Sequence, residues 1–128
     1  MERKIISTAA LLGAASIILG AFGAHALKEV LNQPQLNIFE TGVRYQMYHA
    51  LFLLLVGTST HISDKAKATI LYLTLVGILF FSGSLYLLAA RDLVGFNVKV
   101  IGIITPIGGL LLIVAWIYLF IDFIRKKS

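Results

Sequence analysis

The sequence has no cysteine, only two prolines and few charged residues, which make up 13% of its 128 positions. Without cysteine there is neither a disulfide framework nor thiolate chemistry, so the redox compartment is left open. In a typical soluble domain about a quarter of the residues are charged. The low charge content, together with a hydrophobic share of 59%, instead predicts a membrane protein.

Four apolar runs account for most of the chain: Ile5 to Ala24, Tyr45 to Thr60, Thr69 to Ala90 and Val100 to Ile124. With its flanking residues, each run is long enough to cross a hydrocarbon layer of ~30 Å as a helix. We therefore predict an all-α protein, an integral membrane four-helix bundle that forms a single transmembrane domain over residues 1–128. The expected helices cover residues 5–24, 38–60, 69–90 and 100–124, with a short interfacial helix over residues 26–32.

The start of the second helix is predicted from Asn37, which has Glu40 three residues further on. This spacing resembles a capping box with asparagine as the N-cap. Gln33 and Pro34 are expected to close the preceding segment. We therefore expect the helix to begin near Ile38.

The first apolar run also has features of a signal peptide, because basic residues precede it and Ala24-His25-Ala26 has the small-residue pattern of a cleavage site. Its apolar stretch of roughly 20 residues is longer than the usual core of about 7–15. We interpret it as a retained helix.

The basic residues indicate an orientation. Seven lie in the two terminal tails and the second linker (Arg3, Lys4, Lys65, Lys67, Arg125, Lys126 and Lys127), and four lie on the other side (Lys28, Arg44, Arg91 and Lys99). Since positively charged segments stay in the cytoplasm, both termini are predicted to be cytoplasmic. The formal net charge of +5 is spread over helix ends, which favours contact with anionic membrane lipids over nucleic acid.

Small residues recur along the first helix at steps of three and four, namely Gly13, Ser16, Gly20 and Gly23. Such a stripe lets a second backbone approach closely, although small residues are also common in membrane helices in general. We therefore predict that this helix is central, packs through these positions and can join copies of the chain in a homo-oligomer.

The second helix carries polar side chains into an apolar run. Because successive helical residues are ~100° apart, one face collects Thr41, Arg44, Tyr45, Tyr48 and His49. Glu40 lies four residues before Arg44, at the spacing of a helical ion pair. If this helix lies in a membrane, these polar groups need partners on neighbouring helices.

Such partners are expected at the same depth, toward the non-cytoplasmic surface: His25, Ser82, Ser84, Tyr86 and Thr105. Independent helices would not need polar residues at one level, so we predict a shared cluster with Arg44 in its middle. Trp116, by contrast, is expected to anchor the cytoplasmic end.

Two interpretations of the cluster stay open. A buried arginine costs ~2.5–3.5 kcal/mol on insertion scales, so the network could serve only to satisfy Arg44 and fix helix packing. Alternatively, it forms a pocket facing the outer leaflet, in which Arg44 holds the headgroup of a lipid or other amphiphile. Such a pocket would support envelope integrity or transport.

Catalysis has less support. His49 could act as a general base with Ser82, Ser84 or Tyr45, but the nearest carboxylate on its helix, Glu40, is ~13 Å away along the axis. A haem or metal held by His25 and His49 is a weak alternative, because no further ligands accompany the pair. We expect no catalytic residue, no metal and no cofactor.

Four segments, in this order, resemble one family of small membrane proteins: residues 20–27 (GAFGAHAL), 41–51 (TGVRYQMYHAL), 81–86 (FSGSLY) and 105–109 (TPIGG). The family is called domain of unknown function 423 and is similar to eukaryotic transmembrane protein 256. The resemblance implies a multi-pass protein of the bacterial inner membrane with about four helices. It implies no established activity, substrate or catalytic residue.

Overall fold

The computed structural model describes residues 1–95 and 97–127, with side chains up to Arg125. Its long helices are α1 (Glu2–Ala24), α2 (Gln33–Thr58), α3 (Asp64–Ala89) and α5 (Val98–Lys127), and its short elements are the 3-10 helix η1 (Leu27–Glu29) and helix α4 (Arg91–Val94). No strand occurs in this part of the chain, which confirms the all-α class. The predicted orientation also rests on Lys126 and Lys127, whose side chains lie outside the described residues.

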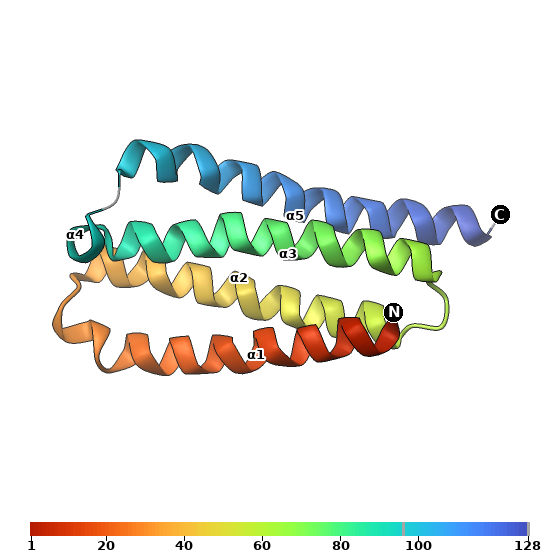
Figure 1. Cartoon of the computed structure of the whole chain (residues 1–128), viewed down its shortest axis with the longest axis horizontal. Helices are drawn as coiled ribbons and strands as arrows, with labels where there is room; N and C mark the ends of the chain where they lie inside the picture. Colours follow the sequence, from red (N-terminus) through yellow and green to blue (C-terminus); the bar gives the residue numbers. More distant parts are fainter. Residues whose placement is uncertain (96, 128) are drawn as a thin grey trace.

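The long helices lie side by side in the order α1, α2, α3 and α5, each antiparallel to the next (Figure 1). Helix α3 packs against both α2 and α5, whereas α1 packs mainly against α2. The prediction of a central first helix was therefore wrong, because α1 lies at one edge and α2 and α3 take the inner positions. We call the end at which α1 begins and α5 ends the terminal end, and the opposite end the η1–α4 end.

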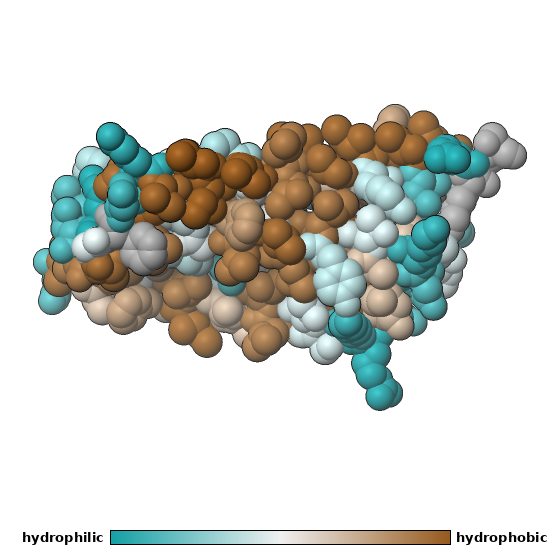
Figure 2. Space-filling model, turned by 45° about the horizontal axis from the view of Figure 1, so that its top comes forward, coloured by the Kyte–Doolittle hydropathy of each residue, from teal (hydrophilic) through white to brown (hydrophobic). Residues whose placement is uncertain are grey.

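On the face shown in Figure 2, a belt of mostly apolar side chains covers the middle of the molecule, and hydrophilic side chains gather at both ends. Three stretches are long and apolar enough to cross a membrane by length and composition: Glu2–Glu29, Asp64–Ala89 and Val98–Arg125. Helix α2 does not belong to this group, and its first half carries Glu40 and Arg44.

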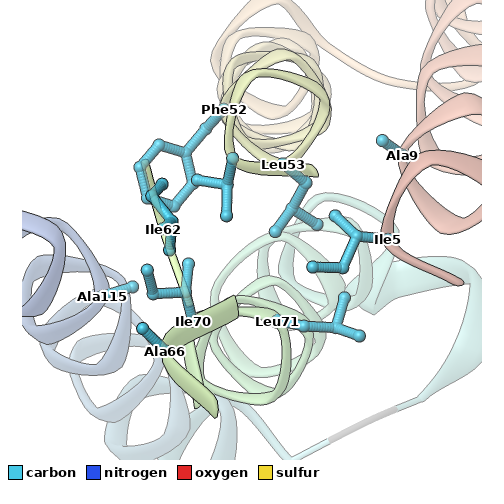
Figure 3. Packing of buried hydrophobic residues seen from close by; sticks show 10 residues of the cluster. Ile5, Ala9, Phe52, Leu53, Ile62, Ala66, Ile70, Leu71 and Ala115 are labelled. Atoms are coloured by element: carbon cyan, nitrogen blue, oxygen red, sulfur yellow. The ribbon is translucent and has the colours of Figure 1, made fainter. Parts of the chain in front are cut away.

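The main hydrophobic core lies toward the terminal end. Ile5, Leu53 and Leu71 are completely buried between α1, α2 and α3, and Ile70, also completely buried, lies on the side of α3 toward α5 (Figure 3). Ala115 brings α5 against the same cluster. These contacts hold the helices together where the α2 to α3 connection is short.

The predicted stripe of small residues on α1 faces α2. A Cβ atom added at Gly13 would lie 3.9 Å from Ala50 Cβ, and one added at Gly20 would lie 3.7 Å from Val43 Cγ1. A Cβ atom added at Gly23 would lie 3.0 Å from the Phe39 ring. Ser16 is also buried, and its hydroxyl donates to the Leu12 carbonyl, 2.8 Å away. The stripe is thus occupied within the chain.

Helix α2 begins at Gln33, and the predicted cap at Asn37 was wrong. Asn32 is the N-cap: its Oδ1 accepts from the Gln35 backbone N–H at 2.9 Å, and Gln35 Oε1 accepts from the Asn32 backbone N–H at 3.0 Å. Pro34 fits this first turn because the backbone N–H that it lacks would have no helical partner there. Asn37 lies inside the helix.

The other boundaries also differ from the expected ones. The segment over residues 26–32 forms only the single turn η1. Helix α3 begins at Asp64 rather than near residue 69, because the Ser63 side chain caps it by accepting from the Ala66 backbone N–H at 3.2 Å.

Candidate functional site

The interior polar groups meet in pairs rather than in one cluster. His49 is 4% exposed. Its Nδ1 lies 2.7 Å from the Tyr45 carbonyl oxygen, and its Nε2 accepts the indole N–H of Trp116 at 3.1 Å. Because a carbonyl can only accept and an indole can only donate, these contacts define a neutral imidazole with its hydrogen on Nδ1.

Trp116 has a further role that the sequence did not indicate. Its indole joins α5 to α2, and its ring packs against Phe52 with a centroid distance of 4.1 Å. That it also anchors the cytoplasmic end stays a prediction. His49, its partner, lies closer to Thr58 than to Gln33.

The two serines are engaged with neighbours other than His49. Ser82 donates to the Gly42 carbonyl at 2.7 Å, and Ser84 pairs with the Thr105 hydroxyl at 2.6 Å. The hydrogen-bonding groups of His49 are likewise taken up by Tyr45 and Trp116. Neither Ser82 nor Ser84 is therefore placed for His49 to activate.

His25 lies far from this interior. It is exposed at the C-cap of α1, at the η1–α4 end. His49 is buried in another helix with both ring nitrogens hydrogen-bonded. The two histidines are therefore not arranged as a pair of haem or metal ligands.

Gln46 joins three helices, a role that the sequence reasoning missed. Its Nε2 donates to the Leu12 carbonyl of α1 at 3.0 Å, and its Oε1 accepts from the Tyr86 hydroxyl of α3 at 2.6 Å. Gln46 is 5% exposed. The sequence signal that could have found it is its position four residues after Gly42, on the same helix face, because Gly42 also faces α3.

Lys67 was counted as a cytoplasmic charge but is buried. Its ammonium donates to the Gly57 carbonyl at 2.9 Å, close to the end of α2. A cation is favourable there because the last carbonyls of a helix carry partial negative charge.

The tyrosines and Thr41 lie at the margin of the interior. Tyr45 is 38% exposed and packs against Phe81 of α3 with a centroid distance of 5.1 Å. Tyr48 is more exposed and meets Tyr45 edge-on at 5.3 Å. The Thr41 hydroxyl donates to the Asn37 carbonyl of its own helix at 2.9 Å. None of these contacts requires a ligand.

Arg44 is exposed, and the prediction that it lies in the middle of a polar cluster was wrong. Among the described residues it has neither a hydrogen bond nor an ion pair, and Glu40 also lacks an ion pair in this part of the chain. The physical reason is the rotation of α2. Gly42 and Gln46 face α3 and Val43 faces α1, which leaves Arg44 on the exposed side of α2, next to α1.

Arg44 instead lines a cleft of about 240 Å³ between α1 and α2. We call it the α1–α2 cleft; its walls are Gly20, Phe39, Glu40, Val43 and Arg44. Its floor is apolar and one side bears two opposite charges. Arg44, which has no hydrogen bond or ion pair in the described chain, therefore lines a concave surface.

Two other hollows lie toward the terminal end. A groove of about 700 Å³ between α2 and α5 is almost wholly apolar, with Phe52 and Trp116 in its wall. A second hollow of about 560 Å³ lies along α5 beside Tyr118, Asp122 and Arg125. Neither includes a residue predicted for the site.

An all-α chain with three helices able to cross a membrane, and an apolar belt between polar ends, is a helical membrane protein. The family model described as "Protein of unknown function (DUF423)" matches residues 19–109. The chain belongs to this family, which confirms the resemblance seen in its four motifs.

Curated relatives agree with this assignment. The chain is 42% identical over 110 residues to the UPF0382 membrane protein SH2409 of Staphylococcus haemolyticus, covering 84% of each chain. It is 39% identical over 128 residues to a UPF0382 membrane protein of Haemophilus influenzae, covering 100% of this chain and 99% of the relative. No solved structure was found to match the chain.

Proposed function

We propose that this protein is a multi-pass protein of the bacterial inner membrane that binds a phospholipid at the α1–α2 cleft, with Arg44 holding the lipid phosphate. The observation that carries the proposal is the exposed guanidinium of Arg44, which has no partner in the described chain and lines the cleft. An arginine in a membrane helix needs a partner, water or headgroups. Its planar fork of donors matches the oxygens of a phosphate.

The depth of the cleft supports a headgroup as that partner. Gly20 lies in the cleft wall, and α1 ends at Ala24, so the cleft lies ~6 Å inside the end of α1. Headgroups border the hydrocarbon core at this level. We propose that α2 is the fourth span, with its first turns in the headgroup layer. That position would explain why its first half carries charge.

The exposed face of α2 changes character along its length. Arg44 is followed on this face by Tyr48, Leu51 and Leu55, which are 49%, 53% and 72% exposed. The face therefore runs from charged to amphipathic to apolar toward the terminal end. A phospholipid with its phosphate at Arg44 would lay its acyl chains against the two leucines.

The distribution of basic residues gives the proposed orientation. With both termini in the cytoplasm, the η1–α4 end and the α1–α2 cleft face the outer leaflet. Binding of a phospholipid there would support envelope integrity or lipid transport.

The proposal is tested by native mass spectrometry of the detergent-purified protein. Dioleoylphosphatidylethanolamine is added in one series, and dioleoylglycerol, which lacks the phosphate, in the other. We expect the first lipid to bind and Arg44→Gln to weaken its binding about tenfold, since a charge-assisted hydrogen bond contributes ~1.5–3 kcal/mol and ~1.4 kcal/mol is tenfold.

The matched control is Lys99→Gln, which removes an exposed cation at the same end of the molecule. It should leave binding unchanged, and both variants should keep the thermal midpoint of the wild type. If Arg44→Gln binds the phospholipid as well as the wild type does, the cleft is not a phosphate site.

A purely structural role is the second candidate. It is favoured by the polar pairs between helices, such as Ser84 with Thr105 and Gln46 with Tyr86. These pairs give partners to several interior polar residues and leave Arg44 unexplained. A wild-type protein that binds neither lipid would support this role instead.

A further inference from the structure

Glu40 is the second charged group of the α1–α2 cleft, one helical turn before Arg44. Their spacing would allow an ion pair, yet none joins them in the described structure, and both side chains are exposed. The cleft therefore presents a carboxylate acceptor and a guanidinium donor side by side. Arg44 is the one cation among its lining residues.

We propose that the cleft selects a phospholipid whose headgroup carries a primary ammonium, with Glu40 accepting from the ammonium and Arg44 binding the phosphate. This inference rests on the proposed function, which places the phosphate at Arg44. It adds the chemical class of the ligand, a zwitterionic aminophospholipid such as phosphatidylethanolamine.

The order of the two charges along α2 fits such a headgroup. Glu40 lies ~6 Å nearer the η1–α4 end than Arg44, so it is closer to water. In phosphatidylethanolamine the ammonium is joined to the phosphate by an ethylene bridge and lies on the side away from the acyl chains. With the chains along Leu51 and Leu55, the phosphate meets Arg44 first and the ammonium reaches Glu40.

The same two groups select against other headgroups. Phosphatidylglycerol offers no cation to Glu40, and its negative charge would lie beside that carboxylate. Phosphatidylcholine has a quaternary ammonium without an N–H, so it cannot donate a hydrogen bond. A charge-assisted hydrogen bond to an otherwise unpaired carboxylate should favour the primary ammonium by about tenfold.

The experiment compares three lipids with the same dioleoyl chains: phosphatidylethanolamine, phosphatidylcholine and phosphatidylglycerol. Each is titrated into the detergent-purified full chain, and bound lipid is quantified by native mass spectrometry. We expect the wild type to bind phosphatidylethanolamine about tenfold more tightly than the other two. Glu40→Gln should remove this preference, whereas Arg44→Gln should weaken all three lipids.

The control variant is Glu29→Gln, which removes an exposed carboxylate of η1 at the same end of the molecule and should keep the preference. Two results would overturn the inference while leaving the proposed function intact. One is a wild type that binds the three lipids equally through Arg44. The other is a Glu40→Gln variant that binds all three more tightly, because Glu40 would then merely compete for Arg44. If Arg44→Gln has no effect on any lipid, the proposed function itself fails.

Discussion

Trp116 donates its indole N–H to Nε2 of His49 at 3.1 Å, and this hydrogen bond ties α5 to α2. The other ring nitrogen of His49 lies 2.7 Å from the Tyr45 carbonyl oxygen. Trp116 is the single tryptophan of the chain. Its fluorescence therefore reports directly on this contact between helices.

Replacement of His49 by phenylalanine should destabilise the protein. The variant keeps an aromatic ring but removes the acceptor, so the indole N–H loses its partner at a cost of ~1–3 kcal/mol. We expect a lower thermal midpoint in detergent and an altered Trp116 emission spectrum. Tyr48→Phe is the control, because the Tyr48 hydroxyl is exposed and has no hydrogen bond in the described chain, and it should change stability by less than ~0.5 kcal/mol. Equal midpoints for wild type and His49→Phe would contradict the structural role of the bond.

The same contact predicts a response to acid. Protonated His49 carries hydrogens on both nitrogens and cannot accept from the indole. The bond therefore contributes stability while His49 is neutral and is lost as the pH falls through the titration of this residue. Phe52, Tyr45 and Trp116 surround the ring, and none of these contacts supplies a carboxylate to hold an imidazolium. A pH-dependent change in Trp116 emission should appear in the wild type and be absent from His49→Phe.

Removing the Gln46 side chain should destabilise the protein more than removing the Tyr86 hydroxyl alone. Gln46→Ala breaks its hydrogen bonds to both Leu12 and Tyr86, whereas Tyr86→Phe breaks only the second. Measured hydrogen bonds between membrane helices average ~0.6 kcal/mol, with a maximum near ~1.7 kcal/mol. Unfolding titrations should show that Gln46→Ala is clearly less stable than Tyr86→Phe. Equal stabilities would mean that the bond to the Leu12 carbonyl contributes nothing.

The sequence was sufficient for the fold class but not for the arrangement of the helices. A long apolar run indicates a membrane helix regardless of which helices pack beside it, so α1, α3 and α5 were predictable. Which helices pack together depends on the rotation of each helix about its own axis. The stripe with Gly13 and Gly20 correctly indicated close packing of α1, but it could not show that α2 alone would fill it.

The sequence indicated which polar residues lie in the helices but not how their side chains are arranged. Depth counted along the sequence brought Arg44, His49 and Ser82 to similar levels, but it did not give the direction in which each side chain points. A rotation of 100° per residue separates neighbours on a helix, so Arg44 points outward while Gln46 faces α3. The pairing of Trp116 with His49 could not be predicted, since no local sequence pattern connects residues 67 positions apart.

Gly108 allows the closest approach between α3 and α5. A Cβ atom added there would lie 2.3 Å from the Phe81 backbone nitrogen, so a backbone would have to move. Gly108→Ala should destabilise the protein by ~1–3 kcal/mol, the usual cost of overpacking. Gly102→Ala is the matched control on the same helix, because nothing lies within 4 Å of its added Cβ. It should be neutral or slightly stabilising, as alanine favours helix more than glycine does. Equal thermal midpoints for the two variants would contradict this packing.

The start of α2 gives a direct test between the expected and the observed helix boundary. Asn32→Ala removes the side chain that caps the backbone N–H of Gln35, and loss of such a cap costs ~0.5–2 kcal/mol. Asn37→Ala removes an exposed side chain inside the helix, whose Oδ1 accepts only from the Gln33 side chain in the described structure, at 2.8 Å. Hydrogen exchange should therefore speed up over the first turn of α2 in Asn32→Ala and stay unchanged in Asn37→Ala. The opposite result would place the helix start near Ile38, and the residues from Gln33 onward would then belong to the connection from α1.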